Sequence, residues 1–304
     1  MKAILKHEST RKNFLIIIFL IVIIIIISRI FVIPSLSSDP EPEFIGYIKL
    51  ILDNLFIALV VSVFIGLFTF YIEIPESEKK HSIVDSNMLK EYFPKARLDT
   101  DFWYFSGGTG RYMRAVTIPE ISQTSEKLNS HKNIKINLLD PSDGNLCKSY
   151  AEFRSSLKSG KKTNTWSLKY ARREIISTIC SAVIYKSKNQ LLDISIFLKN
   201  NFSSLRIDLS KDFCFITKED KQEPAVLIPK ETFLYRTYRE ELLQTSKQYK
   251  QLDMTCRMDN IEFGNIQSGD IEEITLHFGF NDFLEQKDFE AIAYIINKND
   301  NPYE

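Results

Sequence analysis

The residues best suited to chemistry form one short glycine-rich segment. They are Ser106, Gly107, Gly108, Thr109, Gly110 and Arg111. Glycines allow the backbone to turn with positive φ and bring its N–H groups close to a ligand. A strand is expected before the segment and a helix after it, so the N-terminus of that helix would point at the same place. Such an arrangement favours a phosphate or a carboxylate.

Two arginines add to this candidate anion site. Arg111 and Arg114 would lie on the first turn of the following helix, where guanidinium groups can make charge-assisted hydrogen bonds. The segment lacks the Gly-Lys-Ser/Thr of a Walker A loop, and Met113 stands where a dinucleotide-binding fingerprint requires Gly or Ala. A tight strand-to-helix turn without a ligand explains the same pattern, so both interpretations stay open.

Asp140 ends the next predicted strand, and ligand-facing residues of open α/β sheets lie at such strand ends. Because Pro141 follows directly, Asp140 is equally suited to cap a helix or form a turn. The chain has no Gly-x-Ser-x-Gly segment, so the sequence does not support a serine hydrolase. We assign no catalytic residue.

The cysteines and histidines argue against a metal site. The four cysteines are widely spaced without a C-x-x-C motif, and the four histidines form no i, i+4 pair. Cys147, Cys180 and Cys214 stand in apolar contexts, which is typical of small core residues in a reducing compartment. The formal net charge is zero, so the whole chain carries no signal for a polyanion. We expect no metal and no other cofactor.

Two long apolar stretches, residues 14–33 and 50–71, precede this part of the chain. About 20 apolar residues in a helix, at about 1.5 Å each, match the ~30 Å hydrocarbon core of a bilayer. A core helix of a soluble protein normally keeps a polar stripe. A signal peptide has an apolar region of about 7–15 residues and a small-residue cleavage site. The pattern therefore predicts a transmembrane hairpin, with the lipid bilayer as its first partner.

Charged residues on either side of the stretches predict the orientation. They are Lys2, Lys6, Arg11 and Lys12 in the tail and Asp39, Glu41 and Glu43 in the connector. By the positive-inside rule the tail is cytoplasmic and the connector is outside. Pro34, Pro40 and Pro42 are expected to keep the connector from being helical. We predict a multi-pass protein of the cell inner membrane, with both termini in the cytoplasm.

A few polar or small residues within the hairpin could serve contacts. Arg29 and Asp53 would lie at similar depth, where they either form a pair or extend separately to the lipid headgroups. Ser62, Gly66 and Thr69 are spaced three or four apart on one face of the second arm. Small residues in such a row favour close helix packing, so we expect a homo-oligomer.

Four regions follow from these patterns: a basic tail (1–13), the hairpin (14–74), a polar linker (75–98) and a cytoplasmic domain (99–304). A short helix is expected over residues 86–93 of the linker, before Pro94. Within the domain, a strand over 102–105, a helix to about 128 and a strand over 134–139 predict a parallel crossover. Helices are expected over 145–157, 165–186 and 233–252, with strands between. The domain is therefore of the α/β or α+β class.

The order of elements over residues 100–250 resembles one half of the phospholipase D superfamily. The histidine and lysine signature of that family, His-x-Lys-x4-Asp, is absent, and His131-Lys132-Asn133 has the wrong spacing. The resemblance thus implies a phospholipase D-like fold without that family's chemistry.

The architecture as a whole resembles the two-helix transmembrane effectors of bacterial anti-phage systems, including retrons. A basic tail, a membrane hairpin and a cytoplasmic α/β domain are shared with them. The resemblance implies an antiviral effector whose cytoplasmic part receives a signal and whose membrane part damages the inner membrane. It implies a nucleotide or nucleoprotein partner, which for a retron would be a reverse transcriptase with its nucleic acid.

Three functions remain in competition at this stage. The first is the membrane effector with a partner-binding domain. The second is a membrane-anchored enzyme that acts on a nucleotide or phosphate ester at the glycine-rich segment. The third is a structural membrane protein. Missing catalytic signatures favour the first over the second, and polar residues within the hairpin favour the first over the third.

The orientation is open to a direct test. Reporter fusions at Asp39 and Glu304 should place the connector outside the cell and the C-terminus inside, because basic residues are retained in the cytoplasm. A C-terminus found outside the cell would contradict the prediction.

Overall fold

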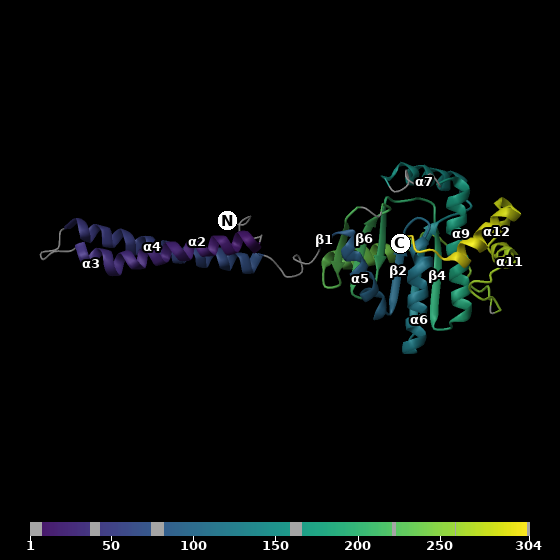
Figure 1. The fold of residues 1–304 in the computed structure, drawn as a ribbon, viewed down its shortest axis with the longest axis horizontal. Coiled ribbons are helices and arrows are strands. Elements are labelled where there is room, and N and C mark those ends of the chain that lie inside the picture. The colour runs from purple at the N-terminus through teal and green to yellow at the C-terminus, as the bar shows by residue number, and fades with distance from the viewer. Residues whose placement is uncertain are drawn as a thin grey trace. The chain divides into compact units, whose positions relative to one another are not determined.

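We describe the protein from a computed structural model that covers residues 8–36, 43–73, 82–158, 166–220, 223–258 and 260–302. The chain divides into two compact units, Met1–Lys79 and Lys80–Glu304. Figure 1 shows the helices of the first unit in purple and blue, and it shows the sheet and helices of the second unit in blue, teal, green and yellow. The boundary lies earlier than residue 99, where the sequence placed the start of the domain.

The first unit is a pair of long helices. Its elements are α2 (Glu8–Ile27), the π-helix η1 (Ser28–Val32), α3 (Ile33–Leu36) and α4 (Glu43–Glu73). The second helix begins well before residue 50, and Pro34 lies inside α3. The prediction that Pro34 keeps the connector from being helical is therefore wrong. Pro40, Pro42 and the tail residues before Glu8 lie outside the described residues.

This first unit has two helices that are long and apolar enough to cross a membrane, at Ile16–Ser35 and Phe44–Ile65. Among its described side chains only Ile25, Ile33 and Ile45 are buried. Large side chains project outward all along both helices, and Phe31 and Phe44 are 68% and 72% exposed. The two helices thus lack the mostly buried character of core helices in a soluble protein.

The polar positions predicted in the hairpin are only partly described. The surroundings of Arg29, Gly66 and Thr69 are not among the described features, although their backbone is helical. Ser62 is exposed on α4. Asp53 is also exposed on α4 and does interact with another residue. The Arg29–Asp53 pair and the contacts between copies stay predictions.

The second unit is built on one eight-stranded sheet. Its strands are β1 (Ser82–Val84), β2 (Phe102–Ser106), β3 (Lys132–Leu139), β4 (Leu192–Lys199), β5 (Leu205–Leu209), β6 (Phe213–Lys218), β7 (Ala225–Pro229) and β8 (Lys250–Gln251). Their order across the sheet is β1-β7-β6-β5-β2-β3-β4-β8. The strands β2, β3 and β4 are parallel, and every other neighbouring pair is antiparallel.

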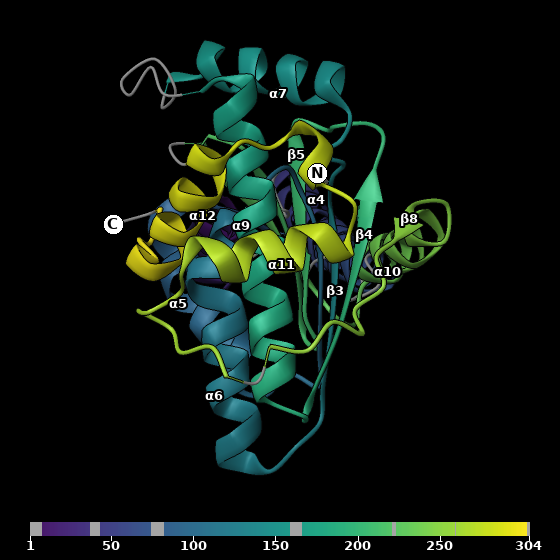
Figure 2. The ribbon, with the colours of Figure 1, turned by 90° about the vertical axis from the view of Figure 1, so that its right-hand side faces the viewer.

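Most helices of this unit pack on one face of the sheet. The helices are α5 (Ser86–Leu98), η3 (Met113–Thr117), α6 (Ile118–Leu128), α7 (Gly144–Ser156), α9 (Leu168–Lys188), α10 (Phe233–Ser246), α11 (Ser268–His277), η4 (Asn281–Phe283) and α12 (Gln286–Lys298). In Figure 2, α9 runs along the sheet with α11 and α12 in front of it, while α7 lies across one end. Among the helices described, α10 alone packs against the other face, on β2, β6 and β7.

The two faces of the sheet have separate apolar cores. Trp103, Ile136 and Ile196 point from the parallel strands into the larger core under α9, which contributes the fully buried Ile175 and Ile179. Leu209, Cys214 and Ile228 form the smaller core under α10. The strands β3 and β4 alternate apolar and polar residues over much of their length, but the last four residues of each are all buried because the strands are covered on both sides.

Helix starts follow the expected capping chemistry. The side chains of Asp143, Ser167 and Thr232 accept hydrogen bonds from backbone N–H groups at the beginnings of α7, α9 and α10. The predicted parallel pairing of β2 with β3 is confirmed. The predicted core burial of Cys147, Cys180 and Cys214 is also confirmed.

Three expectations about element bounds differ from the structure. The segment expected as a linker contains β1, which pairs with β7, and α5, which continues through Pro94. The last expected long helix stops at Ser246, and the chain returns to the sheet as β8. Pairing with the sheet decides the local structure of β1 and β8, and burial of Phe93 and Ala96 in the core holds α5, neither of which the local sequence pattern reports.

The same Ile-Pro dipeptide shapes a π-turn in each unit. Ile118 N–H donates to the carbonyl of Met113, five residues back, and Pro119 follows. Ile33 N–H donates in the same way to Ser28, and Pro34 follows. A proline lacks an N–H and its ring clashes with the carbonyl four residues earlier, so the turn widens. Near Pro119 the displaced carbonyl of Ala115 accepts a hydrogen bond from Asn299 Nδ2 (3.3 Å).

A buried amide that joins α6 to the end of α9 gives a stability prediction. Asn189 Nδ2 donates to the Ser122 carbonyl (3.2 Å) and to the hydroxyls of Ser122 (3.0 Å) and Ser125 (2.7 Å). Asn189→Ala leaves these buried acceptors without their donor and should lower the free energy of unfolding by about 2–3 kcal/mol. Urea unfolding followed by tryptophan fluorescence measures this in the full chain, because Trp103 and Trp166 both belong to the second unit.

Asn145→Ala is the matched control, since Asn145 is exposed on α7. Its effect should stay within about 0.5 kcal/mol. Equal losses in the two variants would contradict a structural role for the buried amide.

Candidate functional site

The glycine-rich segment lies where the three parallel strands end. It connects β2 to the helical turn that starts at Arg111. The strand ends lie side by side, because Gly107 N–H donates to the Asn137 carbonyl (3.2 Å) and Asp140 N–H to the Lys199 carbonyl (3.0 Å). Ligands of open α/β sheets bind at this edge. The predicted segment therefore stands at the edge of the sheet where a ligand site is expected.

The glycines act in two different ways. Gly110 has positive φ, at 71°, so it alone makes the left-handed turn that the sequence suggested for all three. A Cβ at Gly110 would meet Leu138 and Thr178 at 2.8 Å. At Gly108 a Cβ would collide with the Tyr150 hydroxyl, so this glycine is needed for close approach. The segment is buried from Gly107 to Gly110.

A carboxylate of the chain itself binds the segment. Glu219, in the turn after β6, accepts a hydrogen bond from Gly108 N–H (Oε1, 3.2 Å) and another from Arg154 Nη1 (Oε2, 2.8 Å). Arg154 also donates to the Glu219 carbonyl. Burial, and after it the neighbouring Glu219, raise the pKa of the Tyr150 hydroxyl well above its ordinary value. A carboxylate thus lies at the position that the sequence predicted for an anion.

The two predicted arginines pair with a different carboxylate. Glu174 on α9 lies 2.9 Å from Arg114 Nη2 and 3.4 Å from Arg111 Nε. Arg114 and Glu174 are both 3% exposed, and Arg114 Nη1 also donates to the Glu174 carbonyl (3.3 Å). Burial, and then Glu174, raise the pKa of the adjacent Tyr170 to about 12. The arginines therefore tie the first helical turn to α9.

The remaining predicted residues have local partners. Asp140 Oδ1 accepts a hydrogen bond from Ser142 N–H (2.9 Å), which is the turn-forming role that Pro141 suggested. The Thr109 carbonyl accepts one from Thr178 Oγ1 (2.8 Å). Ser106 is half-buried at the end of β2 and pairs with Ile207 of β5.

Sequence reasoning missed Lys199 and Glu219. It expected Tyr150 and Arg154 only on the surface of the helix after Asp140, whereas Tyr150 is fully buried and Arg154 is 13% exposed. Arg154 comes from α7, and its guanidinium lies 4.6 Å above the ring of Trp166. Lys199 is the last residue of β4 and is 3% exposed. Its burial lowers its pKa to about 8, and Glu219 acts in the opposite direction. A charged residue at the end of an apolar strand was the available signal for Lys199, whereas Glu219 is far away in the sequence.

A second buried ion pair lies beside this site on β5. Arg206 Nε is 3.3 Å from Asp208 Oδ2, and Asp208 Oδ1 accepts a hydrogen bond from Trp103 Nε1 (3.2 Å). Burial raises the pKa of Asp208, although Arg206 and Trp103 act against this. Arg206 also lies next to Gly107, where a Cβ would be 3.1 Å from its Cγ.

Metal-binding and thiol chemistry find no support in this part of the chain. Within the described residues, no group of three or more His, Cys, Asp or Glu side chains could hold a metal ion. Burial raises the pKa of Cys147 to about 11, so its thiol stays protonated at neutral pH. The arrangement is suited to holding an anion by charge and hydrogen bonds.

Comparison with known proteins assigns no family. No protein-family model matches the chain, and no curated protein matches it.

The buried Glu174 cluster gives a prediction about stability. Glu174→Gln removes the charge that balances two arginines, of which Arg114 is buried, and should lower the free energy of unfolding by about 3 kcal/mol. Urea unfolding followed by tryptophan fluorescence measures the change.

Asp101→Asn serves as the control, because Asp101 is exposed and lies 3.6 Å from Lys211. An exposed pair of this kind contributes less than about 1 kcal/mol. If both variants lose the same small amount, Glu174 does not hold the first helical turn on α9.

Proposed function

We propose that this chain is a membrane effector of a bacterial antiviral, abortive-infection system. Its two N-terminal helices span the inner membrane, and its α/β domain lies in the cytoplasm with both termini. The domain binds a nucleotide or nucleoprotein partner and controls disruption of the membrane. The antiviral setting rests on the resemblance of the architecture to anti-phage effectors, and a reverse transcriptase with its nucleic acid is the partner in a retron-type system.

One observation carries the membrane part of the proposal. The first unit exposes large apolar side chains along both helices, with only Ile25, Ile33 and Ile45 buried among its described side chains. Soluble monomers rarely expose contiguous apolar patches above a few hundred Å². Lipid or other apolar surface must therefore cover these helices. Their length fits the hydrocarbon core of a bilayer.

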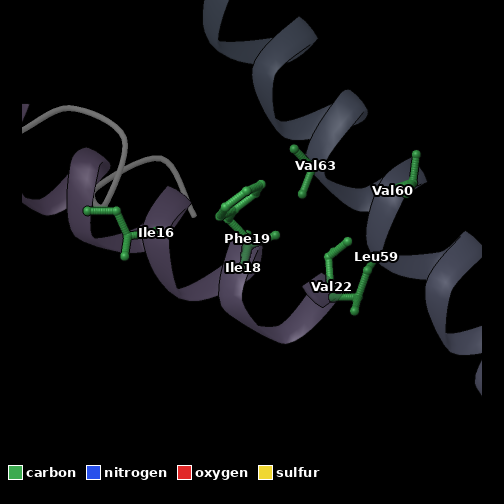
Figure 3. A pocket seen from close by; sticks show the side chains of 7 residues that line it. All are labelled: Ile16, Ile18, Phe19, Val22, Leu59, Val60 and Val63. Atoms are coloured by element: carbon green, nitrogen blue, oxygen red, sulfur yellow. The ribbon is translucent and has the colours of Figure 1, made fainter. Parts of the chain in front are cut away.

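A groove between the two helices supports assembly of several copies. It has a volume of about 510 Å³ and is lined only by apolar residues: Ile16, Ile18, Phe19, Val22, Leu59, Val60 and Val63. Figure 3 shows Val22 beside Leu59, and Phe19 pointing from α2 toward α4. Two helices cannot enclose a water-filled path, whereas several hairpins can. A helix of a second copy is an occupant of suitable shape, since helix association in membranes depends on close van der Waals packing.

The α/β domain supports binding better than catalysis. Its arginines and carboxylates are paired with one another at the strand ends, and the predicted phospholipase D-like fold would lack that family's catalytic motif. The toxic state is then a changed assembly of copies, which a partner selects by binding one state more tightly.

Membrane depolarisation tests the proposal. Expression of the full chain should depolarise the inner membrane, and residues 82–304 alone should not, because the hairpin carries the activity. Gly66→Leu should weaken depolarisation, since a large side chain blocks close approach of helices while the arm stays apolar. The measurement is a potential-sensitive dye in cells that express each form at the same level.

Gly46→Leu is the matched control, because Gly46 of α4 has open space around it. This variant should keep full activity. If residues 82–304 alone kill cells whose membrane potential is intact, soluble chemistry at the glycine-rich segment replaces the present proposal.

A further inference from the structure

The anion position of the glycine-rich segment is filled by the turn that joins β6 to β7. The Glu219 carboxylate takes the Gly108 N–H and one Arg154 nitrogen, which are donors of the kind that bind phosphate. Arg154 is held in place by the ring of Trp166, 4.6 Å from its guanidinium carbon. The donor set is therefore fixed before any ligand arrives.

Two cationic donors at this position are left without a partner. Lys199 is 3% exposed, and its Nζ makes no hydrogen bond or ion pair with any residue that the structure describes. Arg154 Nε is buried and likewise has no hydrogen-bond partner in the described part. A buried donor such as Arg154 Nε is costly to leave unsatisfied, and more so because the group is charged. One carboxylate does not satisfy the whole set.

A phosphate group matches these donors better than a carboxylate does. It presents more acceptor oxygens than the two of Glu219 and carries up to two negative charges, so it could accept hydrogen bonds from Gly108 N–H and from two Arg154 nitrogens at once. Burial lowers the pKa of Lys199 to about 8, and the Glu219 carboxylate acts to raise that pKa. Lys199 is therefore mostly charged at neutral pH. The unsatisfied charge is therefore positive.

We propose that Glu219 is an internal substitute for a ligand phosphate, and that a phosphate ester binds at the ends of β2, β3 and β4 by displacing it. Arg154, Lys199 and Gly108 N–H hold the phosphate, and the Tyr150 hydroxyl adjoins it. This inference names the ligand class of the cytoplasmic domain. Its biological consequence rests on the proposed function.

Calorimetric titration of the full chain in phosphate-free detergent tests the site. The probes are inorganic phosphate, AMP and glycerol 3-phosphate, the last as a mimic of a lipid headgroup. Glu219→Gln should bind the preferred probe about tenfold more tightly, because an uncharged glutamine competes less well than the carboxylate for Gly108 N–H and Arg154. Lys199→Met should bind it about tenfold more weakly. Preference for AMP indicates a nucleotide, and preference for glycerol 3-phosphate indicates a headgroup; both support the site.

Lys132→Met is the matched control. Lys132 is equally buried, at 3% exposed, but it is the first residue of β3 and so lies at the opposite end of the parallel strands from Lys199. Tryptophan fluorescence checks that each variant is folded. If neither the wild type nor Glu219→Gln binds any probe, or if Lys132→Met weakens binding as much as Lys199→Met, the proposal is overturned. Binding by a chain that does not depolarise membranes overturns the proposed function and leaves the site intact.

Discussion

The hydrogen bonds to the Glu219 carboxylate join three parts of the α/β unit at one point. They connect the segment after β2, the helix α7 and the turn after β6. A buried carboxylate is stable only when charged or N–H donors surround it, so these three parts must meet with little freedom. This explains why Gly108 has no room for a side chain and why Tyr150 is fully buried beside it. The geometry at the strand ends depends on this contact.

The buried carboxylate Glu174 plays the corresponding role on the other side of the segment. It binds Arg111 and Arg114 and so holds the π-turn η3 against α9. Between Glu219 and Glu174, the glycine-rich segment is enclosed by its own chain.

The two units differ in where their apolar side chains lie. The α/β unit places its apolar side chains in two cores, one on each face of the sheet. The helix pair has too few elements to enclose a core, and its apolar side chains face outward. The Ile-Pro dipeptide nevertheless makes the same π-turn in both, because the missing N–H of proline is a local property. In the α/β unit a distant side chain, Asn299, binds a carbonyl beside that turn.

Much of the fold could be predicted from the sequence, because its signals are local. Unbroken apolar runs indicated both long helices, and alternation with turn residues indicated β2 to β7. The sequence also placed the glycine-rich segment at the end of β2 and foresaw a turn at Asp140. It determined that Cys147, Cys180 and Cys214 are core residues. Each of these follows from residues within a few positions of one another.

Only the tertiary structure decided which side chains occupy the site. Glu219 lies 111 residues from Gly108 along the chain, and Glu174 lies 60 from Arg114. No local periodicity reports such partners. The same holds for β1, whose three residues form a strand only because β7 offers them an edge, and for β8, which pairs with the end of β4. Long-range hydrogen bonds and ion pairs thus turned a predicted open anion loop into one that is bound by the chain's own carboxylate.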